Sequence, residues 1–265
     1  MEVENKVRLL GSSFGLSDKI LVAYSGGVDS SFLLYVLKMF SEAKVAAITV
    51  KTSYIPEWEV EEAKSFCKSL DIFHEVIELP LPEAIIMNPP DRCYLCKSIL
   101  FGHIKTYAAG KGFNIVADGS NADDKKDYRP GMRALRELDI RSPLLETGFT
   151  KEEIRSQLRE FGLDIWDKPA YACLLTRIPY NTRIDINDLE IIEKGEKLLH
   201  RLGLRGARVR LHKNLVRIEL NPAYFNKVMD DMVRKEIISS FKASGIEYIS
   251  LDLEGYRMGS MNIKK

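Results

Sequence analysis

Residues 24–30 have the sequence Tyr24-Ser-Gly-Gly-Val-Asp-Ser30 and lie directly between a predicted strand and a predicted helix. The preceding apolar run, Ile20–Tyr24, is typical of a buried strand, and Ser30–Phe40 carries its apolar residues on one helix face. In an open α/β sheet, ligands bind at the carboxyl ends of the strands. The two glycines let the backbone approach an anion, the serines add hydroxyl donors, and the helix start is positive. Residues 24–30, here called the glycine loop, therefore predict an anion-binding site.

The glycine loop differs from the two commonest phosphate-binding motifs. It contains neither GxxxxGK[ST] nor GxGxxG, and no lysine lies in the turn. One alternative is a tight strand–helix turn whose glycines serve steric needs alone. A lone pair of glycines would be a weak signal, but the whole hexapeptide Ser25–Ser30 is specific, which favours an anion site.

Strands and helices continue to alternate after the glycine loop. We expect strands at 44–50, 73–79 and 113–118, and helices at 56–70, at 93–109 and after the capping box Thr150–Glu153. This alternation predicts an α/β fold with a doubly wound parallel sheet and right-handed crossovers.

The pattern changes near residue 168. A long irregular stretch at 168–185 precedes a predicted helix at 186–202, strands at 207–212 and 215–220, a helix from 221 to 245 and a strand at 246–253. This α-β-β-α-β order predicts a smaller α+β domain, so we expect domains at 1–168 and 169–265.

Composition excludes several classes of protein. With 265 residues, 45% of them hydrophobic, and a net charge of +1, the chain is not intrinsically disordered. It has no apolar run near the roughly 18 residues of a membrane span, and its acidic start is unlike a signal peptide. We therefore expect a cytoplasmic protein without membrane contact, whose four cysteines stay reduced. Residues 170–265 hold 17 Lys and Arg against 12 Asp and Glu, a modest excess that suits a small anionic ligand at least as well as nucleic acid.

Three cysteines form a candidate ligand set. Cys93 and Cys96 have C-x-x-C spacing at the expected start of a helix, whose positive end lowers a thiol pKa, and Cys173 lies in the long irregular stretch. Three thiolates suit a 4Fe–4S cluster with one open iron. Zinc with a fourth ligand such as His103, or three independent cysteines, are the alternatives. Cys67 has apolar neighbours at helical spacing, which predicts a core thiol.

The glycine loop resembles the pyrophosphatase loop (PP-loop) of the ATP pyrophosphatases. These enzymes cleave ATP between the α and β phosphates and activate a substrate by adenylation. The resemblance implies that the loop holds the pyrophosphate and that Asp29 helps place Mg²⁺, which prefers carboxylate and phosphate oxygens.

Nearly the whole chain resembles the LarE family of ATP-dependent sulfur transferases. The likeness includes the glycine loop, Asn88–Lys97, Asp118–Asp124, Asp127–Gly131, Ala172–Tyr180, Arg208–Arg210 and Gly255–Met261. It implies adenylation of a carboxylate of pyridinium biscarboxylic acid mononucleotide, conversion to a thiocarboxylate, and a homo-oligomer. Sacrificial members give up the sulfur of a cysteine at the Cys173 position and typically lack the C-x-x-C pair. This chain has the pair and so resembles the branch whose three cysteines hold a 4Fe–4S cluster.

The resemblance also implies roles for individual residues. Residues 1–168 would bind ATP, and residues 169–265 would serve substrate binding and sulfur transfer. Catalytic roles are implied for Asp29, Cys173 and Arg177, and cluster binding for Cys93, Cys96 and Cys173. Nucleotide or substrate contacts are implied for Ala23, Ser25, Gly26, Gly27, Val28, Asp29, Ser30, Gly119, Arg129, Arg208 and Arg210.

Simpler interpretations exist for several of these residues. Arg208 and Arg210 alternate with apolar residues on one strand, which also describes a solvated face. Asp123, Asp124 and Arg129 also suit a plain polar turn. Glu190, Glu193 and Glu196 suit a solvated helix stripe, with one glutamate able to face the Cys173 loop.

Two other functions compete with sulfur transfer to a small nucleotide. A tRNA thiolase of the same superfamily is the first, although we see neither a pair of C-x-x-C motifs nor a strongly basic RNA face. A non-enzymatic ATP-binding module is the second. The source of the sulfur does not follow from the sequence.

Overall fold

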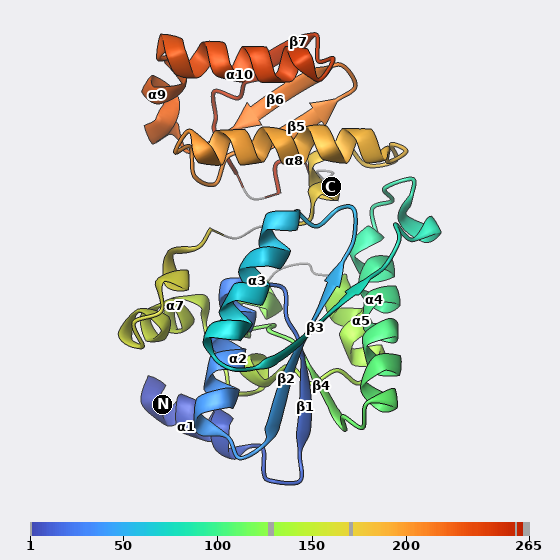
Figure 1. The fold of residues 1–265 in the computed structure, drawn as a ribbon, viewed down its shortest axis with the longest axis vertical. Coiled ribbons are helices and arrows are strands. Elements are labelled where there is room, and N and C mark those ends of the chain that lie inside the picture. Colours follow the sequence, from blue (N-terminus) through green and yellow to red (C-terminus); the bar gives the residue numbers. More distant parts are fainter. Residues whose placement is uncertain (1, 127–129, 170–171, 258, 262–265) are drawn as a thin grey trace. The chain divides into compact units, whose positions relative to one another are not determined.

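The computed structural model describes residues 2–126, 130–169, 172–257 and 259–261, and the chain divides into two compact units. Unit 1 comprises Met1–Ile85 and Asp91–Lys168, and unit 2 comprises Ile86–Pro90 and Pro169–Lys265. Figure 1 shows the course of the chain. The five-residue segment Ile86–Pro90 therefore belongs to unit 2 although its neighbours on both sides belong to unit 1.

Unit 1 is built on a four-stranded sheet in the order β3-β2-β1-β4 (Figure 1). Its strands are β1 (Lys19–Ala23), β2 (Lys44–Lys51), β3 (Phe73–Glu78) and β4 (Ile115–Ala117). All three pairings are parallel, with Ile20 opposite Val45 on one side and Ile115 on the other. The predicted parallel sheet is confirmed.

Helices cover both faces of this sheet. The helices of unit 1 are α1 (Val3–Ser12), α2 (Val28–Phe40), α3 (Glu57–Ser69), α4 (Arg92–Gly110), α5 (Gly131–Glu137), α6 (Pro143–Glu146) and α7 (Lys151–Glu160). One apolar core joins α1, α2, α3 and α7 to the sheet, and a second joins α4 and α5 to its other face. The sheet is doubly wound, as expected.

The strand order places a topological switch point between β1 and β4. The chain steps from β1 outward to β3 and then returns through α4 to the other side of β1. The connections that leave β1 and β4 therefore diverge to opposite faces. In doubly wound sheets, ligands bind at such a point, at the carboxyl ends of the strands. The glycine loop follows β1 at this point.

Unit 2 contains a three-stranded sheet in the order β5-β6-β7. Its strands are β5 (Arg208–His212), β6 (Leu215–Glu219) and β7 (Tyr248–Leu251), and its helices are α8 (Ile186–Arg201), α9 (Phe225–Met229) and α10 (Asp231–Ala243). β5 and β6 form a hairpin, and β7 pairs with β6 in parallel. The expected α+β arrangement is present.

The single helix expected from 221 to 245 is wrong. The chain forms a short 3-10 turn at Pro222–Tyr224, then α9, and then α10. Asp230 has non-helical backbone angles (φ −57°, ψ 136°), and its carboxylate accepts hydrogen bonds from the amides of Met232 and Val233. Asp230 is therefore the N-cap of α10, and its non-helical backbone separates α10 from α9. None of the described helices is long and apolar enough to cross a membrane.

Candidate functional site

The glycine loop brings the end of β1 close to the start of α2. Gly26 has φ +70°, a left-handed conformation that suits glycine. A Cβ at this position would lie 3.2 Å from the Glu59 carbonyl oxygen of α3, so the close packing also favours glycine. Gly27 is the N-cap of α2, and the loop therefore ends at the positive end of this helix.

Two serine hydroxyls line the glycine loop. The Oγ atoms of Ser25 and Ser30 lie 3.1 Å apart, and the Gly27 amide donates to Ser25 Oγ at 3.3 Å. Ser30 Oγ also lies 3.1 Å from the Gly27 carbonyl oxygen, to which it donates. Ser25 is exposed, whereas Ser30 is buried. The loop presents hydroxyl and amide groups together at a helix start, as an anion site requires.

The end of β4 meets the glycine loop across the switch point. A Cβ on Gly119 would lie 2.8 Å from the Ser30 backbone nitrogen, so only glycine allows this approach. Asn121 Nδ2 donates to the Asp29 carboxylate at 2.9 Å. The carboxylate of Asp118 accepts from the Ser120 and Ser142 hydroxyls at 2.6 Å each. The residues implied at both strand ends thus come together.

Two carboxylates share this edge of the sheet. Asn121 connects them, because its side chain donates to Asp29 and its backbone amide donates to Asp124 at 3.1 Å. Burial, together with the charge of Asp124, raises the pKa of Asp29, and Lys151 opposes the shift. Lys151 Nζ lies 3.5 Å from Asp124. A divalent cation bound to Asp29 would offset the free-energy cost of keeping two carboxylate charges close together in a partly buried place. The carboxylates of Asp29 and Asp124 therefore fit Mg²⁺ as ligands.

The other residues expected to contact the nucleotide belong to the same loop. Ala23 is the last residue of β1 and is half-buried, and Val28 is the first residue of α2 and is buried. Arg129 lies outside the described residues.

Cys93 and Cys96 lie in the first turns of α4, as expected. Cys93 is exposed and Cys96 is half-buried. Cys96 Sγ lies 3.2 Å from the hydroxyl of Tyr54, a side chain in the core of unit 1. Burial raises the pKa of the Cys96 thiol, and the Tyr54 hydrogen bond only partly opposes this. The expected lowering of the thiol pKa is therefore wrong for Cys96. Loss of hydration raises this pKa by more than the positive end of the helix lowers it.

Cys67 is a core thiol, as predicted. It is fully buried on α3, and burial raises its pKa to about 12. A thiol in this state is neither a nucleophile nor a ready metal ligand.

The Arg177 side chain joins the loop that carries Cys173 to helix α8 within unit 2. Arg177 is buried and forms a bidentate ion pair with Glu196 of α8, at 2.7 and 2.9 Å. Its Nη1 donates to the Ala172 carbonyl at 2.9 Å and to the Thr176 hydroxyl at 2.7 Å. These bonds fix the backbone beside Cys173, so the geometry supports a positioning role for Arg177.

Asn88 joins the short inserted segment of unit 2 to the same loop. This buried side chain donates to the carbonyl oxygens of Leu175, Ile178 and Pro179, at 3.3, 2.9 and 3.0 Å. The Asn88 carbonyl in turn accepts from the amide of Asn181 at 3.1 Å. The chain that leads into the C-x-x-C helix is thus bound to the chain that carries Cys173.

Arg208 and Arg210 do not lie on a solvated face. Their exposed fractions are 2% and 4%. Arg210 pairs with the buried Glu219 at 2.7 and 3.0 Å and donates to the Thr176 carbonyl at 3.0 Å. Arg208 donates to the backbone carbonyls of Gly206 and Ala207 at 3.1 and 3.0 Å. The two arginines therefore have different surroundings although they share a strand face.

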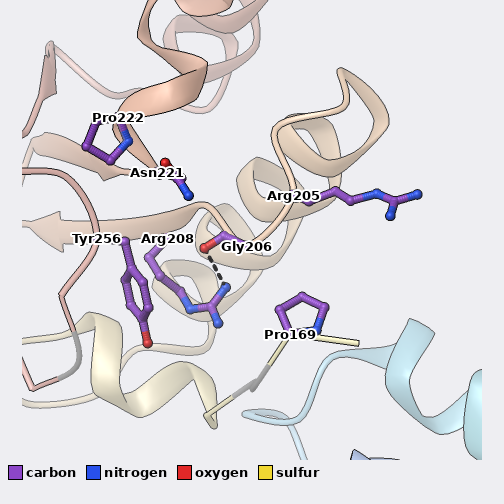
Figure 2. A pocket seen from close by; sticks show the side chains of 7 residues that line it. All are labelled: Pro169, Arg205, Gly206, Arg208, Asn221, Pro222 and Tyr256. Atoms are coloured by element: carbon purple, nitrogen blue, oxygen red, sulfur yellow. Dashed lines mark hydrogen bonds between the residues drawn. The ribbon is translucent and has the colours of Figure 1, made fainter. Parts of the chain in front are cut away.

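Arg208 lines a pocket of about 300 Å³ in unit 2 (Figure 2). The lining residues are Pro169, Arg205, Gly206, Arg208, Asn221, Pro222 and Tyr256. The Arg208 guanidinium lies 5.1 Å from the centre of the Tyr256 ring, and Figure 2 shows the two side chains next to each other. The pocket combines a guanidinium group with an aromatic wall, which suits a planar anionic ligand.

Several residues of these sites carry no recognisable sequence signal of their own. Asn121 and Asn88 lie in segments that carry the family resemblance, but their bonds join segments far apart in sequence. Glu196 was one of three glutamates at equal spacing, and its burial distinguishes it.

Within the described ranges, no group of three His, Cys, Asp or Glu side chains gathers closely enough to hold a metal ion.

Comparison with known proteins identifies relatives over almost the whole chain, although no protein-family profile matches it. An uncharacterised protein of Synechocystis is 40% identical over 264 residues, 98% of both chains. The pyridinium-3,5-bisthiocarboxylic acid mononucleotide synthase of Lactiplantibacillus plantarum is 32% identical over 249 residues, 92% of this chain and 89% of the relative. A tRNA-specific 2-thiouridylase of Clostridium botulinum is 29% identical over 189 residues, 57% of this chain and 52% of the relative. The extent of the second match and the PP-loop geometry agree, and the chain belongs to the LarE family of sulfurtransferases.

Proposed function

We propose that this protein uses ATP to convert a carboxylate of pyridinium biscarboxylic acid mononucleotide into a thiocarboxylate. The observation that carries the proposal is the PP-loop geometry, in which Gly119 and Asn121 of the β4 connection meet Ser30 and Asp29. The 32% identity to the Lactiplantibacillus synthase, over 92% of this chain, supports the substrate.

The chemistry explains why ATP is needed. A carboxylate resists attack by sulfur because its leaving group would be oxide. In the proposed first step, a carboxylate oxygen attacks the α-phosphorus of ATP, and pyrophosphate leaves. In the second, a sulfur nucleophile attacks the acyl carbon, and AMP leaves with the former carboxylate oxygen. The glycine loop would bind the pyrophosphate, with Mg²⁺ held by Asp29 and its neighbour Asp124.

We place the mononucleotide in the pocket of unit 2. Its phosphate or its carboxylates are suited to the fork of Arg208, and its flat ring is suited to the face of Tyr256. Arg177 and Arg210 would hold the Cys173 loop in place, since each donates to a carbonyl oxygen within residues 172–176.

We also propose that Cys93, Cys96 and Cys173 together hold a 4Fe–4S cluster. Cysteine thiolates are the usual ligands of such clusters, and Cys93 is exposed at the start of α4 while Cys96 is half-buried beside the Tyr54 hydroxyl. The bonds of Asn88 support the set, since they join the segment before Cys93 to the segment after Cys173. When bound, such a cluster supplies an iron with an open position for a sulfur ligand. We further propose that the protein forms a homo-oligomer.

The function is tested by anaerobic assay of the purified protein with ATP, Mg²⁺, the mononucleotide and sulfide. We expect pyrophosphate and AMP in equal amounts, and a product heavier than the substrate by one sulfur minus one oxygen. ATP cleavage without this mass change would contradict the assigned acceptor. Visible absorbance and iron content of the same preparation test the cluster.

A tRNA thiolase is the second candidate, since the match to the tRNA-specific 2-thiouridylase covers 57% of this chain. Gel shift with tRNA at several salt concentrations separates the two, because phosphate contacts give binding that weakens steeply with salt. We expect no salt-dependent shift at micromolar protein. Thiolation of tRNA in place of the mononucleotide would favour this candidate.

Replacing Arg208 tests the substrate pocket. In Arg208→Ala, we expect calorimetry to show a loss of about 1.5–3 kcal/mol in binding of the mononucleotide, the contribution of a hydrogen bond to a charged group. ATP affinity should stay unchanged. Arg201→Ala is the control, because Arg201 is an exposed residue of α8 that pairs with Glu236.

Arg210→Ala should weaken the mononucleotide as well, but it also leaves the buried carboxylate of Glu219 without this ion pair. Arg208→Ala is therefore the cleaner variant. If Arg208→Ala lost as much affinity for ATP as for the mononucleotide, the assignment of ATP to unit 1 and of the mononucleotide to unit 2 would be wrong.

A further inference from the structure

A lysine at the end of unit 1 bonds to the backbone of the glycine loop. Lys168 Nζ donates to the Gly26 carbonyl oxygen at 2.7 Å and to the Glu62 carboxylate of α3 at 2.6 Å. It also lies 5.9 Å from the centre of the Trp58 ring. The side chain is only 12% exposed, so water competes weakly for these bonds.

The backbone of Lys168 is itself held in place. Arg155 of α7 donates to the Lys168 carbonyl oxygen at 2.8 Å and also to the carbonyl oxygen of Trp166. The Lys168 amide donates to the carbonyl oxygen of Ile165 at 3.1 Å. The ammonium group therefore reaches the glycine loop from a fixed point rather than from a free end.

The bond from Lys168 sets the orientation of one peptide group in the loop. A trans peptide is planar, with its carbonyl oxygen and its amide hydrogen pointing in opposite directions. Because the Gly26 carbonyl points to Lys168, the amide of Gly27 points the opposite way, and it donates to Ser25 Oγ. Gly26 and Gly27 are both glycines, so the backbone offers little resistance to rotation of this peptide. If it turned over, a carbonyl oxygen would replace an amide donor on the side of the two serines.

We propose that Lys168 is a positioning residue of the ATP site, which holds the Gly26–Gly27 peptide with its amide turned toward the bound phosphates. The inference rests on the proposed use of ATP. The charge of the ammonium is already offset by Glu62, which lies at bonding distance. Lys168 therefore acts through the geometry of the loop, and not as a cation on the phosphates.

Three variants test this role, with ATP affinity measured by calorimetry in the presence of Mg²⁺. Lys168→Met removes the donor and keeps the aliphatic stem, and we expect ATP to bind about ten- to a hundredfold more weakly. Lys168→Arg keeps a donor and should recover affinity to within about threefold of wild type. Lys105→Met is the matched control, because Lys105 also donates to a backbone carbonyl, that of Leu138, at 2.7 Å, away from the loop.

The ATP affinities of these variants decide whether Lys168 positions the loop. Equal ATP affinity in Lys168→Met and wild type would overturn the proposal, as would an arginine variant as weak as the methionine variant. Glu62→Gln should leave ATP affinity within about threefold of wild type, and a marked gain would show that Lys168 acts through its charge instead. If wild type itself bound no ATP, the proposed function would fail together with this inference. ATP bound normally but no sulfur transferred would remove the proposed acceptor and leave the role of Lys168 standing.

Discussion

Asp29→Asn should reduce pyrophosphate release by about a hundredfold or more without unfolding the protein. The carboxylate belongs to the glycine loop, at the start of α2, and its negative charge is what a magnesium ion on the pyrophosphate requires. Loss of one such electrostatic contact typically reduces a rate by about 10²–10³-fold. The Asn121 amide can still donate to the oxygen of an asparagine, so the packing at the switch point is kept.

A matched control separates this effect from a general effect of losing a carboxylate. Asp188 also lies in the first turn of a helix, α8, and partial burial raises its pKa as it does that of Asp29. Asp188→Asn should keep full pyrophosphate release, measured with an enzyme-coupled phosphate assay. Full activity in Asp29→Asn would instead remove Asp29 from the mechanism.

Local patterns were enough to predict the fold of unit 1. The apolar runs at 20–24 and 44–50 became the central strands β1 and β2, because buried parallel strands need continuous apolar sequence. The capping box at Thr150 is present, with the Glu153 amide donating to the threonine and the Glu153 carboxylate accepting in return. These features depend on neighbouring residues, and the sequence displays them directly.

The contacts that assemble the candidate sites join segments far apart in the chain. Lys168 is 142 residues from Gly26, and Asn121 is 92 residues from Asp29. Alternation predicted an outward face for Arg208 and Arg210, yet the strand is covered on both sides. The alternation of apolar and polar residues along a strand indicates that one face is buried, but it does not reveal that other segments also cover the second face. The glycine loop was predictable because all of its parts are adjacent.

The three cysteine variants distinguish two mechanisms of sulfur transfer. If Cys93, Cys96 and Cys173 hold one cluster, each single alanine variant should lose the visible absorbance and the thiolation activity together. Adenylation should persist in all three, because the glycine loop contains none of these residues. Cys67→Ala is the control and should keep both properties, since this thiol is fully buried in the core of unit 1.

The sacrificial mechanism predicts a different pattern. In it, Cys93 and Cys96 are dispensable, only Cys173→Ala is inactive, and turnover stops at one sulfur per chain with dehydroalanine at 173. The cluster mechanism instead requires more than one turnover with added sulfide, and an unchanged mass at Cys173. We favour the cluster because the C-x-x-C pair begins a helix that directly follows the segment Ile86–Pro90, and Asn88 in this segment bonds to the Cys173 loop. The sacrificial route gives that pair no purpose. Dehydroalanine at 173 in an active preparation free of iron would overturn this choice.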